Sequence, residues 1–182
     1  LPITEKAKRK NIPLFSELEI AYRLIQPKLV IAITGTNGKS TTVALTGEIF
    51  RQAEINTNSK VIVAGNIGFP LSAAVEKVDP DTTLVLEVSS YQLELIEKFH
   101  PHIAAILNIT PDHLERHQTM ENYARLKSRI FENQTKKDFC IFNADDPYCE
   151  KLAKSCLSQT IFFSSQKKLD KGIFFDGKKI VV

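Results

Sequence analysis

Residues 29–41 read Leu-Val-Ile-Ala-Ile-Thr-Gly-Thr-Asn-Gly-Lys-Ser-Thr, an apolar run that leads into a loop with two glycines. The run at residues 29–33 is typical of a strand that is buried on both faces of a parallel sheet. A helical stretch follows the loop and continues to about Arg51. A strand, a glycine-containing loop and a helix in this order are typical of a phosphate-binding loop in an α/β protein.

The loop carries the residue types that a phosphate-binding site needs. Oriented backbone N–H groups and the positive end of a helix dipole bind phosphate oxygens at such a loop. We expect Lys39 to bridge the terminal phosphates of ATP and the Ser40 hydroxyl to contact Mg²⁺. The match to the full Walker A pattern is incomplete, because Ile33 stands where that pattern has a glycine. The predicted ATP-binding residues of the loop are Gly35, Thr36, Asn37, Gly38, Lys39, Ser40 and Thr41.

An ordinary glycine-containing turn is the alternative interpretation, and a Gly-Lys-Ser triplet between a strand and a helix argues against it. Nucleotide binding alone does not define a reaction. A GTPase would need an Asn-Lys-x-Asp sequence, which the chain lacks. Residues 143–146, Asn-Ala-Asp-Asp, are interpreted as a cap for the helix that follows them. Small-molecule kinases and helicases stay open at this point.

The rest of the chain alternates apolar strand candidates with helical stretches, which predicts βαβ units. We therefore predict an α/β fold with a mainly parallel sheet flanked by helices. Ser16 and Glu19 form a capping-box pattern that opens a short helix before Pro27. Asp176-Gly177 between two β-rich arms predicts a small antiparallel element near the C-terminus, packed beside the main sheet. The predicted strands are residues 60–64, 83–88, 103–109, 139–142 and 160–163, and the predicted helices lie near residues 70–77, 91–98, 120–133 and 147–155.

Composition narrows the class of protein. The 182 residues, 43% of them hydrophobic, suffice for one sizeable core. A net charge of +3 is too small to indicate nucleic acid or an anionic membrane as a partner, and no apolar run approaches the length of a membrane span. The basic run at residues 6–10 is interpreted as a solvated surface turn. Three cysteines without a C-x-x-C spacing favour a cytoplasmic location over a disulfide framework or a zinc site.

Glu87 lies at the carboxyl end of the predicted strand at residues 83–88. Ligands of open α/β sheets bind beyond the carboxyl ends of the strands, so a carboxylate there can face the phosphate loop and hold Mg²⁺. The alternative is an edge glutamate in solvent, and the apolar run around it argues against that reading.

Asp112 and His113 follow another apolar strand. Thr110 is a plausible N-cap and Pro111 suits the first helical position, so we expect both residues in a first helical turn. His113, Glu115 and His117 do not match the zinc-protease H-E-x-x-H pattern, because the glutamate must directly follow the first histidine. His113 alone is compatible with a structural histidine and with a ligand.

Lys127 falls inside the apolar stripe of its predicted helix, whereas Arg125 and Arg129 fall on the far side. A lysine on a buried face needs a reason, because burial disfavours its charge. One reason is that the side chain extends to the rim of the core, which the helix pattern favours. The other is chemical: a neutral amine can add CO₂ and become a carbamate, which supplies oxygen ligands for Mg²⁺.

Together these segments resemble the Mur ligases. The resemblance covers about residues 29–146 and rests on motifs that occur in this order: the phosphate loop, Gly65-Asn66-Ile67-Gly68, Glu87-Val88-Ser89-Ser90-Tyr91-Gln92-Leu93-Glu94, Asn108-Ile109-Thr110-Pro111-Asp112-His113, and Lys127. The Ser89 to Glu94 stretch is similar to the family member that adds D-glutamate. The resemblance therefore implies UDP-N-acetylmuramoyl-L-alanine and D-glutamate as substrates, ATP and two Mg²⁺ as cofactors, and an acyl-phosphate intermediate in peptidoglycan synthesis.

The resemblance also implies a role for each matched residue. Lys39 holds the phosphates, while Ser40 and Glu87 hold the first Mg²⁺. His113 and carbamylated Lys127 hold the second Mg²⁺. For Lys127 this role replaces the interpretation, favoured by the helix pattern alone, that its side chain extends to the rim of the core. Asp112 lies beside ATP. Asn66, Ser89, Ser90 and Gln92 line the substrate side.

Mur ligases have three domains, so the resemblance implies that residues 1–27 are the tail of a UDP-binding domain and residues 28–182 an incomplete central ATP-binding domain. We expect a monomer, and we expect this piece not to ligate alone. The alternatives are another ligase of the same superfamily, such as a folylpolyglutamate synthase, and a non-catalytic nucleotide-binding module.

Overall fold

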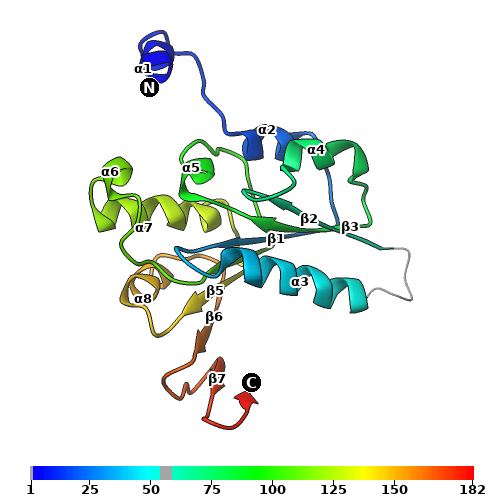
Figure 1. Cartoon of the computed structure of the whole chain (residues 1–182), viewed down its shortest axis with the longest axis vertical. Helices are drawn as coiled ribbons and strands as arrows, with labels where there is room; N and C mark the ends of the chain where they lie inside the picture. The colour runs from blue at the N-terminus through cyan, green and yellow to red at the C-terminus, as the bar shows by residue number, and fades with distance from the viewer. Residues whose placement is uncertain (1, 54–58) are drawn as a thin grey trace.

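The computed structural model describes residues 2–53 and 59–182, and its central element is an eight-stranded sheet (Figure 1). The strand order is β2-β3-β1-β4-β5-β6-β7-β8. All neighbouring pairs are parallel except β7 and β8, which are antiparallel. The strands are β1 Leu29–Thr34, β2 Lys60–Gly65, β3 Thr82–Glu87, β4 Ile103–Ile106, β5 Phe139–Asn143, β6 Gln159–Ser164, β7 Ile173–Phe175 and β8 Ile180–Val181. The predicted α/β fold with a mainly parallel sheet is confirmed.

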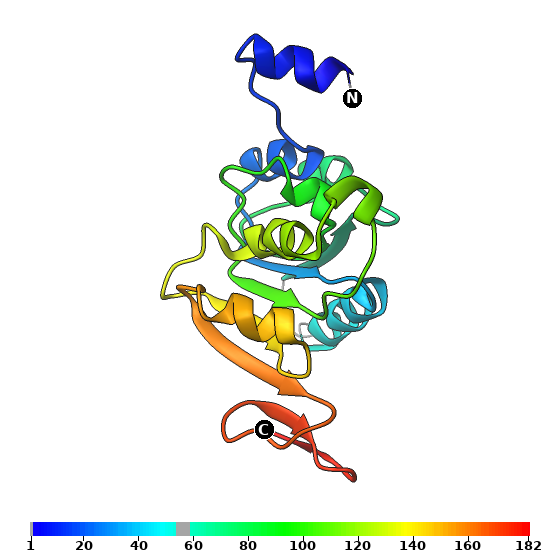
Figure 2. The same cartoon turned by 90° about the vertical axis from the view of Figure 1, so that its left-hand side faces the viewer.

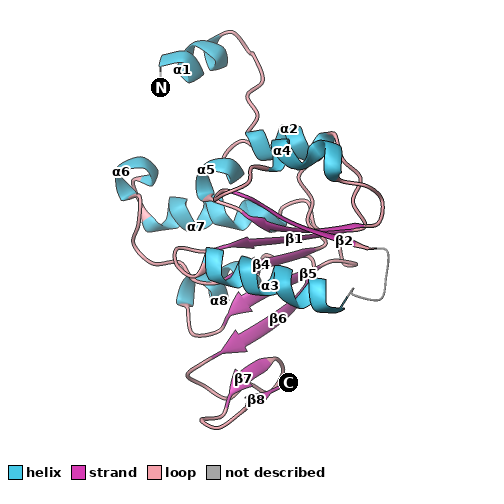
Figure 3. Ribbon diagram, turned by 45° about the vertical axis from the view of Figure 1, so that its right-hand side comes forward, coloured by secondary structure: helices cyan, strands magenta, loops and turns pink. Residues whose placement is uncertain are grey.

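Helices cover the sheet unevenly. Figures 1 and 3 show α3 on one face of the sheet and α2, α4, α5 and α7 on the other. The α-helices are α1 Pro2–Arg9, α2 Glu17–Arg23, α3 Lys39–Ala53, α4 Leu71–Ala74, α5 Ser90–Leu93, α6 Leu114–His117, α7 Met120–Ser128 and α8 Pro147–Ala153, and two 3₁₀ turns are η1 Val75–Lys77 and η2 Arg129–Phe131. Among the described residues, no helix combines the length and the apolar character that crossing a membrane requires.

The core has two parts because successive strand residues point to opposite faces. In β1, Val30 and Ala32 belong to the larger cluster under α2, α4, α5 and α7, whereas Ile31 and Ile33 belong to the smaller cluster under α3. Burial of both faces explains why residues 29–33 form a continuous apolar run instead of an alternating one.

The chain ends lie far from each other. Figure 2 shows α1 at one end of the molecule and the β7–β8 pair at the other. The basic run of residues 6–10 mostly lies on the exposed side of α1, so the prediction of a turn was wrong, although these charges do face solvent. The β7–β8 pair extends the main sheet through parallel pairing with β6, so it does not form a separate element beside it.

The predicted helix at residues 91–98 was wrong beyond Leu93. After α5, side chains from distant elements take the backbone groups that a helix would have bonded. Arg129 donates to the carbonyls of Leu93, Glu94 and Ile96 at 2.6–2.8 Å. The buried Glu19 carboxylate accepts from the N–H groups of Lys98 and Phe99, so Glu19 does not complete the predicted capping box with Ser16.

The predicted first helical turn at Thr110–His113 was also wrong. Thr110 is held by Thr36, whose Oγ1 accepts from the Thr110 N–H at 3.0 Å and donates to the Thr110 carbonyl at 3.1 Å. His113 has φ 51°, in the left-handed region, and α6 begins after it at Leu114. The strand predicted to reach residue 109 ends at Ile106, since the Ile109 N–H bonds to the Asp146 carboxylate instead. Asp146 does cap α8, as predicted.

Gly65 allows β2 and β3 to approach closely at their carboxyl ends. A Cβ atom at Gly65 would lie 2.1 Å from the Glu87 carbonyl oxygen and 2.9 Å from its nitrogen, and Gly65 has φ +122°. Side chains rarely adopt this φ, and the backbone neighbour cannot move away without displacing Glu87.

We predict that Gly65→Ala lowers the free energy of unfolding by more than about 3 kcal/mol, because steric overlap with β3 adds to the strain at positive φ. Chemical denaturation measures the change. Gly68→Ala is the matched control: Gly68 has φ +78° but nothing within 4 Å of its Cβ position, so it should cost only about 1–2 kcal/mol. Equal losses for the two variants would contradict the close approach.

Candidate functional site

Three segments leave the sheet at one edge. The register pairs Ile33 with Glu87 and Thr34 with Ile106, so the carboxyl ends of β1, β3 and β4 lie together. The loop after β1, the Glu87 carboxylate and the segment that leads to His113 all start there. Ligands of parallel sheets bind at this kind of edge.

The phosphate loop lies between β1 and α3, as predicted. The helix begins at Lys39, and Ser40 and Thr41 lie exposed in its first turn. The first N–H groups of a helix have no intrahelical acceptor, so they are available to an anion. The Lys39 Nζ donates to the carbonyls of Gly35 at 3.0 Å and Thr36 at 2.9 Å, so the ammonium group is held against its own loop.

Lys127 reaches the same loop from α7. Its side chain is buried, and its Nζ donates to the Gly35 carbonyl at 2.8 Å and lies 4.6 Å from the centre of the Tyr123 ring. The carbonyl of Gly35 therefore accepts from two lysines. Burial, and then the charge of Lys39, lower the pKa of Lys127 to about 7. The predicted placement of Lys127 on the buried stripe is confirmed, but the interpretation that its side chain extends to the rim of the core was wrong, since Lys127 is 1% exposed. Of the two arginines predicted on the far side, Arg125 is exposed, whereas Arg129 lies in η2 and is partly buried against backbone carbonyls.

Glu87 is buried at the carboxyl end of β3 and pairs with Asn66. The Asn66 Nδ2 donates to Glu87 Oε1 at 3.0 Å, and the Asn66 N–H donates to the Glu87 carbonyl at 2.9 Å. The structure thus brings together Glu87, which was predicted to hold Mg²⁺, and Asn66, which was predicted to bind substrate. Carboxylate and hydroxyl oxygens are hard donors, so Glu87 and Ser40 fit the preference of Mg²⁺, which takes few protein ligands beside phosphates.

Ser89 and Gln92 form a capping box at α5. The Ser89 N–H and Oγ both donate to Gln92 Oε1 at 3.0 Å, and the Gln92 N–H donates to Ser89 Oγ at 3.3 Å. Their spacing, serine followed three residues later by glutamine, is a capping-box signal that the motif-based interpretation did not use. The side chains of Ser89 and Gln92 therefore bond mainly to each other and to the backbone, and they fix the segment that follows Glu87.

Ser90 is buried and hydrogen-bonds through Oγ to the His117 Nε2 at 3.0 Å. His117 stacks on Tyr123 with ring centres 5.0 Å apart, and the Tyr123 hydroxyl lies 3.4 Å from Thr36 Oγ1. These contacts form a continuous chain from α5 to the phosphate loop. Sequence reasoning considered His117 only as a metal ligand and missed this role. Its burial lowers the pKa of His117, and the charges of His113, Arg116 and Lys127 lower it further, although Glu94 opposes them.

His113 lies at the outer end of the site. Its half-exposed ring is 5.4 Å from Tyr91 and 6.5 Å from His117, and its Nε2 lies 3.5 Å from the Asp112 carboxylate. Ring contacts with His117, and the stack of His117 on Tyr123, connect His113 to Thr36 of the phosphate loop. Over residues 2–53 and 59–182, no three His, Cys, Asp or Glu side chains converge as metal ligands.

Asn108 is a residue of the site that sequence reasoning quoted only as part of a motif. Its side chain contacts the backbone of Thr36 and Asn37 in the phosphate loop. The signal available in the sequence was its position directly after an apolar strand, where a polar side chain meets the neighbouring strand-end loops.

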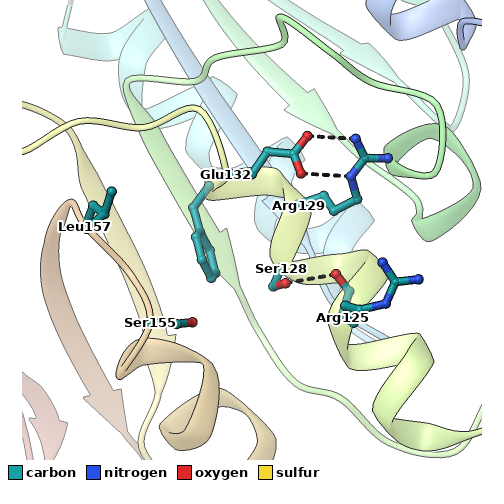
Figure 4. A pocket seen from close by; sticks show the side chains of 7 residues that line it. Arg125, Ser128, Arg129, Glu132, Ser155 and Leu157 are labelled. Atoms are coloured by element: carbon teal, nitrogen blue, oxygen red, sulfur yellow. Dashed lines mark hydrogen bonds and ion pairs between the residues drawn. The ribbon is translucent and has the colours of Figure 1, made fainter.

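A separate surface pocket of about 300 Å³ lies between α7 and the end of α8 (Figure 4). Arg125, Ser128, Arg129, Glu132, Ser155 and Leu157 are among its lining residues. The guanidinium of Arg129 donates hydrogen bonds to the Glu132 carboxylate and to backbone carbonyls. Because α7 buries Lys127 on its other side, this pocket is distinct from the phosphate loop.

Comparisons with known proteins agree with this geometry. The family model of the Mur ligase middle domain matches residues 33–178. The chain is 50% identical over 175 residues to the UDP-N-acetylmuramoylalanine--D-glutamate ligase of Pelotomaculum thermopropionicum, covering 96% of this chain and 37% of that protein. It is 44% identical over 182 residues to the ligase of the same name from Clostridioides difficile, covering all of this chain and 40% of that one. The chain thus spans about two fifths of the length of these relatives.

Among solved structures, the MurF ligase of Thermotoga maritima in complex with ADP superposes with a TM-score of 0.65 at 22% identity, covering 90% of this chain and 40% of that one. At this identity the likeness supports the fold.

We predict that the stability of the chain rises between pH 7 and about pH 9.5 through Lys127. A lysine whose pKa is lower in the folded state than in the unfolded state binds fewer protons when folded over this window, so unfolding becomes less favourable as pH rises. Relative to Lys127→Met, the wild-type chain should gain about 3 kcal/mol over the window. Urea denaturation as a function of pH measures the difference. The stability of the exposed Lys98→Met variant should change with pH as that of the wild type does. The same pH dependence of stability in Lys127→Met and in the wild type would contradict a lowered pKa of Lys127.

Proposed function

This chain belongs to the Mur ligase family through its middle domain, and from this membership we propose that the whole protein is an ATP-dependent amide-bond ligase. It adds D-glutamate to UDP-N-acetylmuramoyl-L-alanine through an acyl phosphate, in peptidoglycan synthesis. The names of relatives at 44–50% identity support the choice of substrates. The observation that carries the proposal is the convergence of Lys39 and Lys127 on the Gly35 carbonyl beside a helix start.

The chemical difficulty of the reaction is that a substrate carboxylate must attack the terminal phosphate of a polyanion. Lys39 supplies a positive charge at the phosphate loop, and the free N–H groups at the start of α3 orient the phosphate oxygens. To reach those oxygens, the Lys39 ammonium leaves the two carbonyls that hold it in this structure. The substrate carboxylate then takes up the phosphoryl group, and ADP leaves.

Ser40 and Glu87 would hold the first Mg²⁺. Bound Mg²⁺ neutralises phosphate charge and stabilises the transferring phosphoryl group. Asn66 keeps the Glu87 carboxylate oriented through its 3.0 Å hydrogen bond, and burial restricts the carboxylate further. Asn66 therefore acts on the metal side of the site in addition to its proposed contact with substrate.

His113 and Lys127 would hold a second Mg²⁺ once Lys127 carries a carbamate. Carbamylation requires the uncharged amine, which forms a bond to the carbon of CO₂ and releases a proton. A pKa of about 7 leaves a substantial fraction of Lys127 uncharged at neutral pH, so the site favours this modification. The Asp112 carboxylate, beside His113, would lie next to ATP.

Ser89, Ser90 and Gln92 support the substrate side mainly by fixing the backbone after Glu87. The Ser89–Gln92 capping box and the Ser90–His117 hydrogen bond hold this segment in place. The exposed Tyr91 ring contacts both His113 and the buried His117, with its ring centre 5.4 Å from each. The amine of D-glutamate then attacks the acyl-phosphate carbon, forms the amide with loss of a proton and displaces phosphate, a step that we expect to need the regions outside this chain.

We predict that the full-length protein forms the amide from UDP-N-acetylmuramoyl-L-alanine, ATP and D-glutamate, and that Lys39→Ala, Glu87→Gln, His113→Ala and Lys127→Ala each lower kcat by about 10²-fold or more. Release of phosphate coupled to amide formation measures the activity. The exposed Lys98→Met variant should keep wild-type activity.

Two outcomes would overturn the proposal. Activity with L-lysine or a folate substrate in place of D-glutamate would indicate another ligase of the superfamily. Unchanged activity in the Glu87, His113 and Lys127 variants would indicate a nucleotide-binding module without a catalytic role. We expect the 182-residue chain alone to bind nucleotide and not to ligate.

A further inference from the structure

The segment that follows β4 runs against the first half of the phosphate loop. A Cβ atom at Gly35 would lie 3.0 Å from the Leu107 Cβ and 3.3 Å from the Asn108 nitrogen, and Gly35 has φ +154°, which side chains rarely adopt, so glycine is favoured at this approach. The Thr36 N–H donates to the Asn108 carbonyl at 2.9 Å. The two segments are far apart in sequence and in contact in space.

The Asn108 side chain bonds to the loop through both of its polar atoms. Its Oδ1 accepts from the N–H groups of Thr36 at 3.1 Å and Asn37 at 2.8 Å. Its Nδ2 donates to the Asn37 carbonyl at 3.0 Å. A carboxamide combines an acceptor with two lone pairs and a donor, so asparagine satisfies all three backbone groups at once.

Other side chains of similar size cannot make the same set of contacts. Aspartate would accept from both N–H groups but could not donate to the Asn37 carbonyl, and it would place a negative charge beside the phosphates. Leucine would leave all three backbone groups without these partners.

We propose that Asn108 is a positioning residue that fixes the first half of the phosphate loop for nucleotide binding. Because Asn108 occupies the N–H groups of Thr36 and Asn37, the donors left for phosphate are those from Gly38 onward, at the start of α3. Thr36, whose N–H Asn108 holds, in turn bonds to Thr110 in the segment that continues to His113. This inference rests on the proposed use of ATP at the loop.

Asn143 provides a matched control on the neighbouring strand. Its Nδ2 donates to the Leu107 carbonyl at 2.9 Å, and its Oδ1 accepts from the Asp145 N–H at 2.8 Å. Asn143 is thus an asparagine whose side chain bonds to the residue before Asn108 and to its own turn.

The experiment compares Asn108→Ala, Asn108→Asp and Asn143→Ala in the full-length protein. Hydrogen exchange of the Thr36 and Asn37 amides is measured without nucleotide, and the KM for ATP and kcat are measured in the ligation assay. Asn108→Ala should speed exchange of the Asn37 amide about tenfold or more, and that of the Thr36 amide less, because the Thr36 N–H keeps its bond to the Asn108 backbone carbonyl. The same variant should raise the KM for ATP about tenfold, a loss typical of two or three hydrogen bonds. Asn143→Ala should leave the amide exchange rates and the KM for ATP within about twofold of the wild-type values, a change smaller than the loss of one hydrogen bond produces.

Asn108→Asp separates geometry from charge. It should keep the slow exchange of Thr36 and Asn37, because the acceptor remains, and raise the KM for ATP most strongly at low salt. Wild-type exchange rates in Asn108→Ala would overturn the inference, as would equal effects of Asn108→Ala and Asn143→Ala on the KM for ATP. A wild-type protein that neither binds ATP nor ligates would instead refute the proposed function, while the exchange rates would still decide whether Asn108 holds the loop.

Discussion

Two lysines from distant parts of the chain donate to one carbonyl, that of Gly35, and the rest of the site depends on this arrangement. Lys39 comes from the start of α3 and Lys127 from the buried side of α7. Two ammonium groups at one acceptor repel each other, and burial makes the charge of Lys127 costly. When both lysines are charged, the unliganded site therefore carries an electrostatic cost that an arriving polyanion would relieve, and this is the physical basis of the proposed nucleotide binding.

The sheet makes this arrangement possible. Parallel strands β1, β3 and β4 end at one edge, so the loop after β1, the Glu87 carboxylate and the His113 segment start close together. Close backbone approaches at Gly65 and Gly35 bring the neighbouring segments into contact. The network from Ser90 through His117 and Tyr123 to Thr36 then couples the segment after Glu87 to the phosphate loop.

The sequence predicted those features that depend on strong local patterns. The apolar run at residues 29–33, the Gly-Lys-Ser triplet and the buried position of Lys127 each follow from periodicity or loop chemistry, and the structure confirms them. The helix predicted beyond Leu93 and the helical turn predicted at Thr110 were wrong, because side chains from distant elements bind those backbone segments. The roles of Asn108 and His117 were missed for the same reason: the Ser90 hydroxyl that binds the His117 side chain lies 27 residues away in sequence, and the Thr36 N–H that binds the Asn108 side chain lies 72 residues away.

The most direct test of the electrostatic account is an NMR titration of the Lys127 Nζ in CO₂-free buffer, where Lys127 carries no carbamate, with and without bound ATP. Without nucleotide, the account predicts a pKa near 7. With ATP bound, the negative charge beside the loop should raise this pKa by more than about one unit, since nearby opposite charge favours the protonated form. A Lys127 pKa that starts near the ordinary lysine value, or that ATP leaves unchanged, would contradict the account.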